Sequence, residues 1–241
     1  MCLIVFAWKV IPGVPLIAAA NRDEFYDRPA APAGWWQDHP QVYAGRDLRG
    51  GGTWLGVSRE GRFAALTNIR APAERRDGAP SRGALVADFL SGTEAPSAYV
   101  ERMQHATDDF NGFNLLIGDH DTLIWYSNRR QDDARNGKPL APGIYGLSND
   151  TLDAPWPKVV RTKAQFASML CQGAPAEAYF EMLSDTTRAS DCRLPQTGVS
   201  LEMERVLSAV CIDSPNYGTR VSTVVQLHAD RSVRLHERAL R

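Results

Sequence analysis

The sequence lacks the features that define several large classes of protein. It has only four cysteines in 241 residues. None of them forms a Cys-x-x-Cys pair, so neither a disulfide framework nor a zinc site is expected. No apolar run approaches the roughly 18 residues of a membrane-spanning helix. Lysine plus arginine number 27 and aspartate plus glutamate 28, so no bulk positive charge directs the chain to nucleic acid or anionic lipid.

The remaining composition is typical of a globular protein. Hydrophobic residues make up 44% of the chain, enough for a sizeable core, and no repeat or linker divides it. We therefore expect one domain over residues 1–241. The first nine residues lack a basic leader, so no signal peptide is expected and the predicted location is cytoplasmic. The five histidines show no paired ligand spacing, so no metal site is expected.

Apolar patterning predicts strands and helices in alternating groups. Two apolar stretches joined by Pro12-Gly13 predict a buried hairpin that ends at the polar run 21–24. The other predicted strands are 53–58, 63–68, 113–117, 122–126, a short one ending at 145–149, 219–227 and 233–238. The predicted helices are 81–90, 95–104, 156–170, 176–183 and 201–209, and the segments 28–40 and 71–82 are expected to be loops. This order favours antiparallel sheets with helices packed outside them.

Cys2 is the first candidate for chemistry. A thiolate is a strong nucleophile, and removal of Met1 would place a free α-amino group on the same residue. That amine has a reference pKa near 8 and can accept the thiol proton, so one residue would supply nucleophile and base. The alternative is a buried cysteine at the start of a core strand.

Asn21-Arg22-Asp23-Glu24 is the second candidate, because four polar residues follow a buried strand directly. Arg22 could hold a thiolate or a carboxylate ligand, and Asp23 could orient an amine. A salt-bridged turn is the competing interpretation.

Three further residues follow or begin predicted strands. The side-chain amides of Asn68 and Asn149 could each donate to a developing oxyanion. Arg220 begins the last long strand, where it would be a second anion-binding group or a charge at the strand edge.

Taken together, these motifs resemble the NRDE family, whose eukaryotic members are called transport and Golgi organisation protein 2. The resemblance covers nearly the whole chain. Its motifs are Met1-Cys2, Ala19-Ala20-Asn21-Arg22-Asp23-Glu24-Phe25-Tyr26 with Arg28-Pro29, Gly51-Gly52-Thr53-Trp54-Leu55-Gly56, Ala64-Ala65-Leu66-Thr67-Asn68, Asn111-Gly112-Phe113-Asn114-Leu115, Tyr145-Gly146-Leu147-Ser148-Asn149, Pro155-Trp156 and Tyr217-Gly218-Thr219-Arg220.

The resemblance implies an α+β fold, an αββα sandwich of two antiparallel sheets flanked by helices, like that of the N-terminal-nucleophile hydrolases. More distantly, the pattern is similar to the choloylglycine hydrolase and penicillin V acylase group. That similarity implies catalytic roles for Cys2, Arg22, Asp23, Asn68, Asn149 and Arg220. In that group the arginine and the aspartate are spaced three apart, whereas Asp23 directly follows Arg22, so Glu24 competes with Asp23 as the orienting carboxylate.

Two functions follow as expectations. The first is a carrier that binds an anionic, partly apolar small molecule, such as haem or an acyl-CoA, and acts in haem or lipid trafficking. Its ligand-binding residues would be Asn21, Arg22, Asp23, Glu24 and Arg220, with no cofactor required and haem as a candidate cargo. The alternative is an amide hydrolase or acyl transferase with Cys2 as its N-terminal nucleophile.

Overall fold

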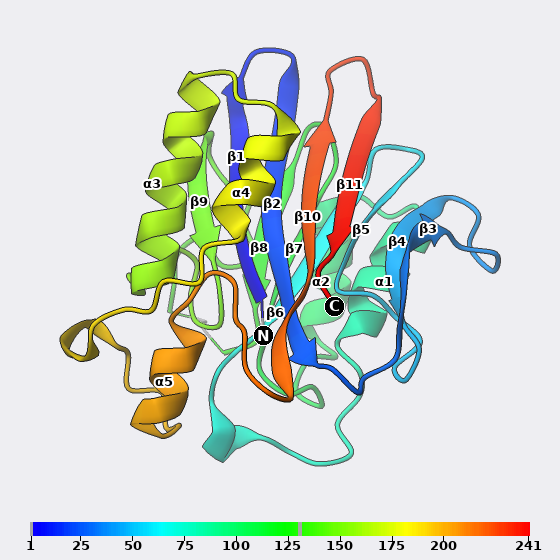
Figure 1. Cartoon of the computed structure of the whole chain (residues 1–241). Helices are drawn as coiled ribbons and strands as arrows, with labels where there is room; N and C mark the ends of the chain where they lie inside the picture. The colour runs from blue at the N-terminus through cyan, green and yellow to red at the C-terminus, as the bar shows by residue number, and fades with distance from the viewer. Residues whose placement is uncertain (1, 130–131) are drawn as a thin grey trace.

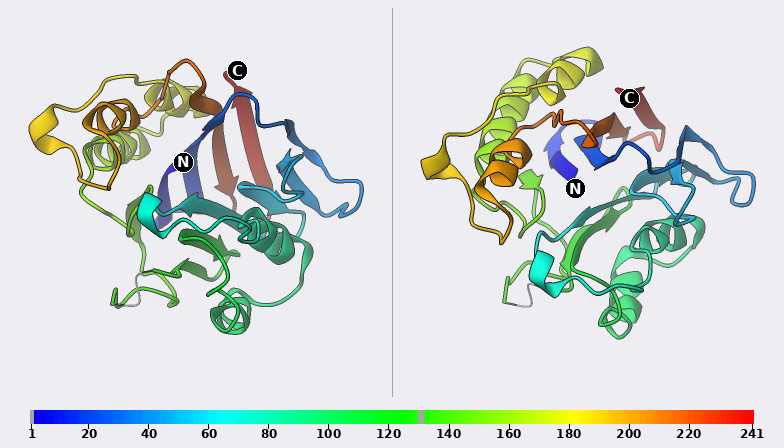
Figure 2. Two further views of the ribbon diagram at one scale, coloured as in Figure 1. Left: turned by 90° about the horizontal axis from the view of Figure 1, so that it is seen from below. Right: turned by 60° about the horizontal axis from the view of Figure 1, so that its bottom comes forward.

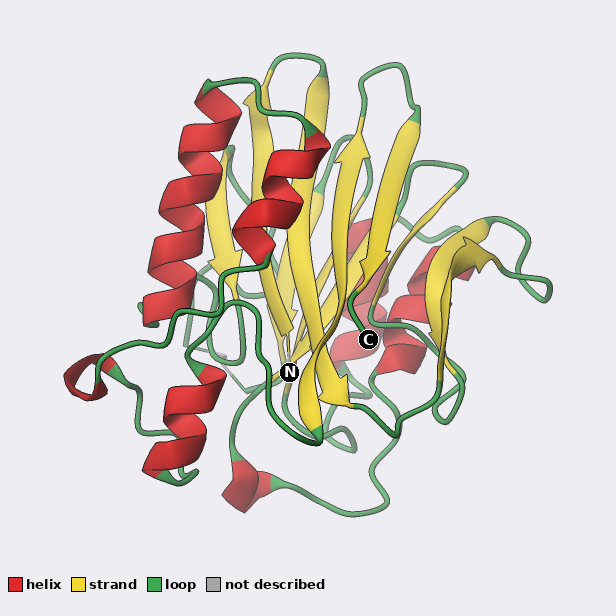
Figure 3. Ribbon diagram, in the orientation of Figure 1, coloured by secondary structure: helices red, strands yellow, loops and turns green. Residues whose placement is uncertain are grey.

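The computed structural model describes residues 2–129 and 132–241. These residues form two antiparallel β-sheets that face each other, with helices on both outer faces (Figure 1). The same four layers are visible from below in Figure 2 and by element type in Figure 3. The predicted αββα arrangement is therefore confirmed.

The first sheet contains the N-terminal hairpin at its centre. Its strand order is β11-β10-β2-β1-β9. The strands span Cys2–Ile11 (β1), Val14–Phe25 (β2), Gly143–Leu147 (β9), Tyr217–Leu227 (β10) and Val233–Ala239 (β11). Residues 2–8 of β1 are all buried, because the second sheet covers one face of this strand and helices cover the other.

The second sheet is built from consecutive strands in the order β3-β4-β5-β6-β7-β8. They span Ala30–Trp35 (β3), Val42–Asp47 (β4), Leu55–Ser58 (β5), Phe63–Asn68 (β6), Phe113–Gly118 (β7) and Leu123–Ser127 (β8). Each strand pairs with the next along the chain, and only the connection from β6 to β7, which carries α1 and α2, is longer than a hairpin turn or loop.

The helices cover the two outer faces. Helices α1 (Gly83–Ser91) and α2 (Pro96–Gln104) pack on the second sheet, and α3 (Pro157–Cys171) and α4 (Ala176–Leu183) pack on the first. A short helix α5 (Leu201–Leu207) and two 3-10 turns, η1 (Pro72–Glu74) and η2 (Asp191–Arg193), complete the regular structure. Proline at the first turn of α2 and of α3 suits a helix start, because the amide that proline lacks has no partner there in any helix.

Three layers of apolar side chains hold the sandwich together. Ile4, Phe6 and Ala20 belong to the core between the sheets, with residues of β5, β6 and β8. Leu3 and Ala19 face the other way and pack under α3 and α4. This two-residue alternation of β1 and β2 decides on which face each functional side chain lies.

Most predicted elements are confirmed, and two are corrected. Strand β2 does not end at the polar run 21–24 but continues through it to Phe25, because Tyr217–Thr219 of β10 pairs with this stretch. The segment 28–40 is not only a loop, since it contains β3, which pairs with β4. Neither strand has a clear apolar alternation at these positions, so the sequence offered little signal for them.

The described residues contain no helix that is both long and apolar enough to cross a membrane.

Candidate functional site

Cys2 lies at one end of the sandwich, directly across from Arg22 in the β1–β2 pairing. Ile4 and Ala20, the paired residues two positions further along the two strands, face the core between the sheets. Because alternate residues of a strand lie on the same face, Cys2 and Arg22 share that face. Cys2 is 7% exposed. The Ser148 hydroxyl donates a hydrogen bond to its carbonyl oxygen, with an O···O distance of 3.0 Å.

The surroundings of Cys2 keep its thiol protonated. Burial raises the pKa of the thiol, while the positive charge of Arg22 and a hydrogen bond from the Asp23 backbone act in the opposite direction. The net shift is upward from an already alkaline reference value, so little thiolate is present near neutral pH. In this structure Cys2 is a shielded group.

Side chains alternate between the two faces of β2, so the four residues of the polar run lie on opposite faces of the strand. Arg22 and Glu24 lie on the face that looks toward the second sheet, and Asn21 and Asp23 lie on the face that looks toward the helices. A turn would have left all four at the surface. Instead Asn21, Arg22 and Asp23 are buried and only Glu24 is partly exposed.

Asn21 ties three segments of the chain together. Its amide nitrogen donates to the carbonyl oxygens of Leu183 and Val210, at 2.8 and 2.9 Å, and its side-chain oxygen accepts a hydrogen bond from Ser222 at 2.6 Å. Both of its N–H groups are donated, and the residue is 0% exposed. Its placement supports a role in the fold and not the ligand contact expected from sequence.

Asp23 is the carboxylate inside the site. It is 1% exposed and accepts a 2.6 Å hydrogen bond from the Thr219 hydroxyl. Burial raises its pKa, and the nearby charge of Lys158 partly offsets this effect. Glu24 lies outside, 3.8 Å from the guanidinium of Arg22. Of the two carboxylates that the sequence left open, Asp23 is the buried one, and from the helix-facing side of β2 its charge raises the pKa of the Cys2 thiol.

Lys158 is the most informative residue that the sequence analysis missed. It lies in the first turn of α3, is 1% exposed, and its ammonium nitrogen has no hydrogen-bond partner in the described structure. Burial lowers its pKa to about 8, against the attraction of Asp23. The available signal was its spacing, because Lys158, Thr162 and Phe166 recur every four residues on the buried stripe of the helix.

Two arginines also approach this region from unexpected segments. Arg82 is partly buried at the end of the segment 71–82 that was expected to be a loop, and it donates to the Gly112 carbonyl oxygen at 3.0 Å. Burial lowers its pKa while the Cys2 thiol and Glu24 act to raise it. Arg70 forms a 2.8 Å ion pair with Glu204 in which both side chains are at most 5% exposed.

Asn68 and Asn149 lie together beside Cys2. The side-chain amide of Asn149 donates to the Asn68 carbonyl oxygen at 2.9 Å. Its side-chain oxygen accepts from Ser148 at 3.2 Å, and the same Ser148 hydroxyl reaches the carbonyl oxygen of Cys2. The strand ends of β6 and β9 thus bring both asparagines to the end of β1 where Cys2 lies.

Arg220 lies at a bulge in β10, where the pairing with β2 shifts by one residue. Its guanidinium donates to the carbonyl oxygens of Phe25 and Arg28. These contacts hold the end of β2 in place, so Arg220 shapes the rim of the site rather than contacting Cys2.

A network of ion pairs forms that rim. Asp47 on β4 accepts hydrogen bonds from Arg22 at 3.3 Å and from Arg28 at 2.6 Å, and Glu24 lies 3.8 Å from both arginines. Beside the network is a pocket of about 270 Å³, lined by Glu24, Phe25, Asp27, Arg28 and Arg49. Phe25 is 56% exposed there, an unusual position for a large aromatic side chain.

Comparison with known proteins decides the family. The sequence profile of the Transport and Golgi organisation 2 family matches residues 1–241. The chain belongs to this family. It is 37% identical to the transport and Golgi organization protein 2 homolog of Bos taurus and 34% identical to that of Homo sapiens, in each case over 100% of this chain and 93% of the relative.

A solved structure extends the likeness to the fold. The Caenorhabditis elegans N-acylethanolamine-hydrolyzing acid amidase ortholog superposes with a TM-score of 0.52 over 100% of both chains, at 14% sequence identity. At this identity the likeness concerns the fold alone. It agrees with the predicted fold, an αββα sandwich like that of the N-terminal-nucleophile hydrolases.

The site offers no evident metal centre. Within the part of the chain that the structure describes, no three His, Cys, Asp or Glu side chains gather as metal ligands.

The substitution Lys158→Met tests the electrostatics of the site. Because the pKa of Lys158 falls from 10.5 to about 8 on folding, the unfolded chain binds more protons than the folded chain between these two values. The destabilising effect of the buried ammonium is complete below pH 8 and disappears as the pH rises to 10.5. The wild type should thus gain stability relative to Lys158→Met across this interval, as measured by urea unfolding. A difference between the two proteins that does not change with pH would contradict the buried, unpartnered ammonium.

Proposed function

We propose that this protein is a carrier that binds an anionic, partly apolar small molecule, of the haem or acyl-CoA kind, at the Cys2 end of the sandwich. The observation that supports this best is the rim pocket, which is lined by exposed Phe25 together with Arg28 and Arg49. A trafficking role is consistent with the name of the family, Transport and Golgi organisation 2, and we propose haem or a lipid-like molecule as the cargo.

Two arginines of the rim are held in position by Asp47, and the pocket beside them is lined by Arg28 and Arg49 together with the acids Glu24 and Asp27. Asp47 fixes the guanidinium groups of Arg22 and Arg28, so little side-chain freedom is lost when a carboxylate or phosphate approaches them. Arg49 is exposed and lies two residues after Asp47, whose side chain accepts hydrogen bonds from the Arg49 and Gly50 amides. Charge-assisted hydrogen bonds from arginines of this kind are the usual means of binding carboxylates and phosphates.

Phe25 would contact the apolar part of the ligand. Its ring packs edge-on against Tyr217, with centroids 5.2 Å apart, and leaves more than half of its surface to solvent. A pocket of about 270 Å³ is smaller than the roughly 300–1,000 Å³ that encloses most drug-sized ligands. The pocket therefore suits the charged group, while a porphyrin or an acyl chain lies over Phe25.

With Met1 in place, the state of Cys2 favours binding over covalent chemistry. Cys2 does not line the rim pocket, and burial raises the pKa of its thiol. A protonated and shielded thiol is a poor nucleophile.

Calorimetric titration with oleoyl-CoA and with haem tests this proposal. We expect micromolar binding of at least one of them and no binding of coenzyme A alone. Phe25→Ala should weaken binding about tenfold or more, since burying a phenylalanine side chain contributes roughly 1.5–3 kcal/mol. Arg49→Ala should weaken it about threefold to tenfold and reduce its sensitivity to salt.

Arg188→Ala is the matched control for Arg49→Ala. Arg188 is also exposed, but it lies in the loop between α4 and η2 and does not line the rim pocket. Its substitution should leave both affinities unchanged. If neither compound binds at micromolar concentration, or if Arg188→Ala weakens binding as much as Arg49→Ala, the carrier proposal fails.

Amide hydrolysis is the second candidate, and the placement of Arg22, Asp23 and Asn149 around Cys2 favours it. After removal of Met1, the Cys2 sulfur would attack the substrate carbonyl carbon while the thiol proton moves to the free α-amino group. The oxyanion would accept hydrogen bonds from the Asn68 and Asn149 amides. The C–N bond then breaks, the amine leaves with that proton, and water hydrolyses the thioester to a carboxylic acid and regenerates the thiol.

An acyl-transferring probe separates the two candidates. The carrier account predicts that an N-acyl activated amide leaves Cys2 unmodified at pH 7, although the exposed Cys171 and Cys192 react with iodoacetamide in the same sample. Intact mass and peptide mapping give both results. An acyl adduct on Cys2 that is absent from Cys2→Ala, together with loss of Met1, would replace the carrier account with the hydrolase.

A further inference from the structure

A second pocket lies at the opposite end of the sandwich from Cys2. Strands β1 and β2 join at the Pro12-Gly13 turn, and that turn accepts a hydrogen bond from Ala229 of the β10–β11 turn at 2.9 Å. Lys9 donates to the Asp121 carbonyl oxygen in the β7–β8 turn at 2.8 Å. The turns of both sheets therefore meet at this end, where they enclose a pocket of about 450 Å³.

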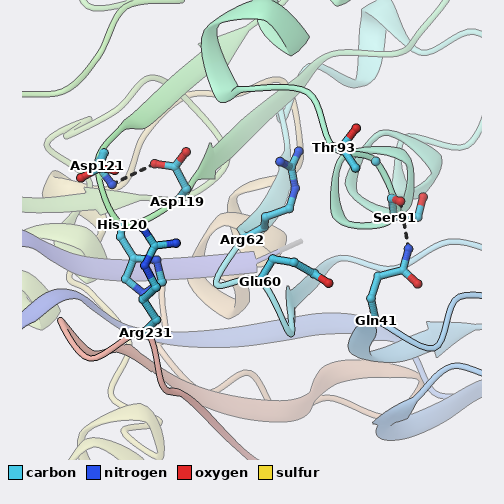
Figure 4. Close-up of a pocket in the computed structure, with 10 residues that line it drawn as sticks. Gln41, Glu60, Arg62, Ser91, Thr93, Asp119, His120, Asp121 and Arg231 are labelled. Atoms are coloured by element: carbon cyan, nitrogen blue, oxygen red, sulfur yellow. Dashed lines mark hydrogen bonds between the residues drawn. The ribbon is translucent and has the colours of Figure 1, made fainter.

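Figure 4 shows how three groups of residues surround the pocket. Glu60 and Arg62 project from the β5–β6 turn in the middle. The acidic β7–β8 turn, with its His120, and Arg231 lie on one side, and Gln41 with the residues that follow α1 lies on the other. The pocket volume falls in the roughly 300–1,000 Å³ range of small-molecule sites.

Arg62 provides the main evidence that this pocket binds a ligand. It is 8% exposed, its Nε donates to the Phe89 carbonyl oxygen at 2.9 Å, and its guanidinium carbon lies 3.8 Å from the centre of the Phe89 ring. Its Nη2 is buried with no hydrogen-bond partner in the described structure. Burial lowers the Arg62 pKa, and the nearby acids Asp119 and Glu60 only partly compensate.

His120 provides a second unsatisfied group in the same wall. Its Nε2 is also buried without a partner in residues 2–129 and 132–241. The ring lies against the backbone of Gly61, where a Cβ would collide with it, which explains glycine between Glu60 and Arg62. Two unpartnered nitrogens in one pocket wall are uncommon, because buried polar groups are nearly always hydrogen-bonded.

The charges of the pocket have both signs and stay apart. Five charged side chains line it: Glu60, Arg62, Asp119, Asp121 and Arg231. None of the ion pairs found in the described part of the chain involves any of these five. The acids also do not form a metal-ligand cluster within those residues. The pocket thus presents separate positive and negative groups to an organic ligand.

We propose that this pocket binds a small zwitterion, such as a free amino acid or a dipeptide. The ligand carboxylate accepts hydrogen bonds from Arg62 and His120, and the ligand ammonium lies against Glu60 and Asp119. Because Arg62 Nη2 is closed to water in this structure, side chains at the wall rearrange as the ligand enters. Three acids against two arginines disfavour a multiply charged phosphate at the same place.

Backbone amide NMR with glycylglycine and with L-glutamine tests the proposal on the whole chain. We expect at least one of the two, at about 10 mM, to shift the resonances of Gly61, Gly92 and His120. Acetate and ethylammonium, which carry one charge each, should shift them much less at the same concentration. If neither zwitterion shifts these resonances, or if acetate alone binds equally well, the proposal is wrong.

Substitutions test which charged side chains of the pocket contact the ligand. Arg62→Lys, which shortens the donor and removes its fork, should weaken binding about tenfold. Arg62 is buried, so Glu60→Gln provides an independent test at an exposed position, with an expected loss of about fivefold or more. Glu181→Gln, an exposed glutamate on α4 away from the pocket, should change nothing. Equal effects of Glu60→Gln and Glu181→Gln would overturn the proposal even if Arg62→Lys does not fold.

Discussion

The two-residue alternation of β2, continued beyond the apolar core, is the constraint on which the site depends. By keeping strand geometry through Asn21-Arg22-Asp23-Glu24, the chain sends two polar side chains toward the helices and two toward the second sheet. Asn21 then anchors the segments that precede β10, and Arg22 faces the Cys2 side of the strand pair. A shift of one residue in register would exchange these roles and bury Glu24 in place of Asp23.

Burial decides the chemistry of the groups gathered around Cys2. Removing a charged group from water costs more free energy than its interactions with neighbouring charges recover. The pKa values of Cys2 and Asp23 are therefore raised, and that of Lys158 is lowered. At the rim, Arg28 is partly exposed and Arg22 is buried, and both are paired with Asp47. The interior is thus arranged as a closed polar cluster, and the rim is the part able to meet a ligand. This division underlies the proposal of a carrier on a fold shared with an amidase.

Much of the fold could be predicted from sequence, because the hairpins and helices carry strong periodicity. Leu85, Val86, Phe89 and Leu90 were expected on one face of a helix, and all four are buried in α1. Apolar periodicity did not predict the structure where polar residues lie inside a strand. The run 21–24 resembles a turn until β10 is known to pair with it, and that pairing joins residues about 200 positions apart. No local pattern reports such a contact.

The sequence named candidate site residues but did not predict their arrangement. Cys2, Asn68 and Asn149 lie at one end of the sandwich, and their catalytic roles stay predictions. Asn21 is taken up by the fold, and Arg220 holds the rim. Lys158 was missed because a lysine at the start of a helix is usually solvated, and only the packing of α3 against the first sheet buries it. Arg82 was missed because nothing in the local sequence shows that the loop before α1 partly buries it.

Hydrogen–deuterium exchange on peptides covering residues 16–25 tests the central claim most directly, since it reports whether the polar run is part of the sheet. The account predicts that the amides of residues 21–24 exchange as slowly as those of Ala18, Ala19 and Ala20, because β10 pairs with the whole stretch. Exchange of residues 21–24 at the rate of an exposed loop, beside a protected 16–20 segment, would contradict it.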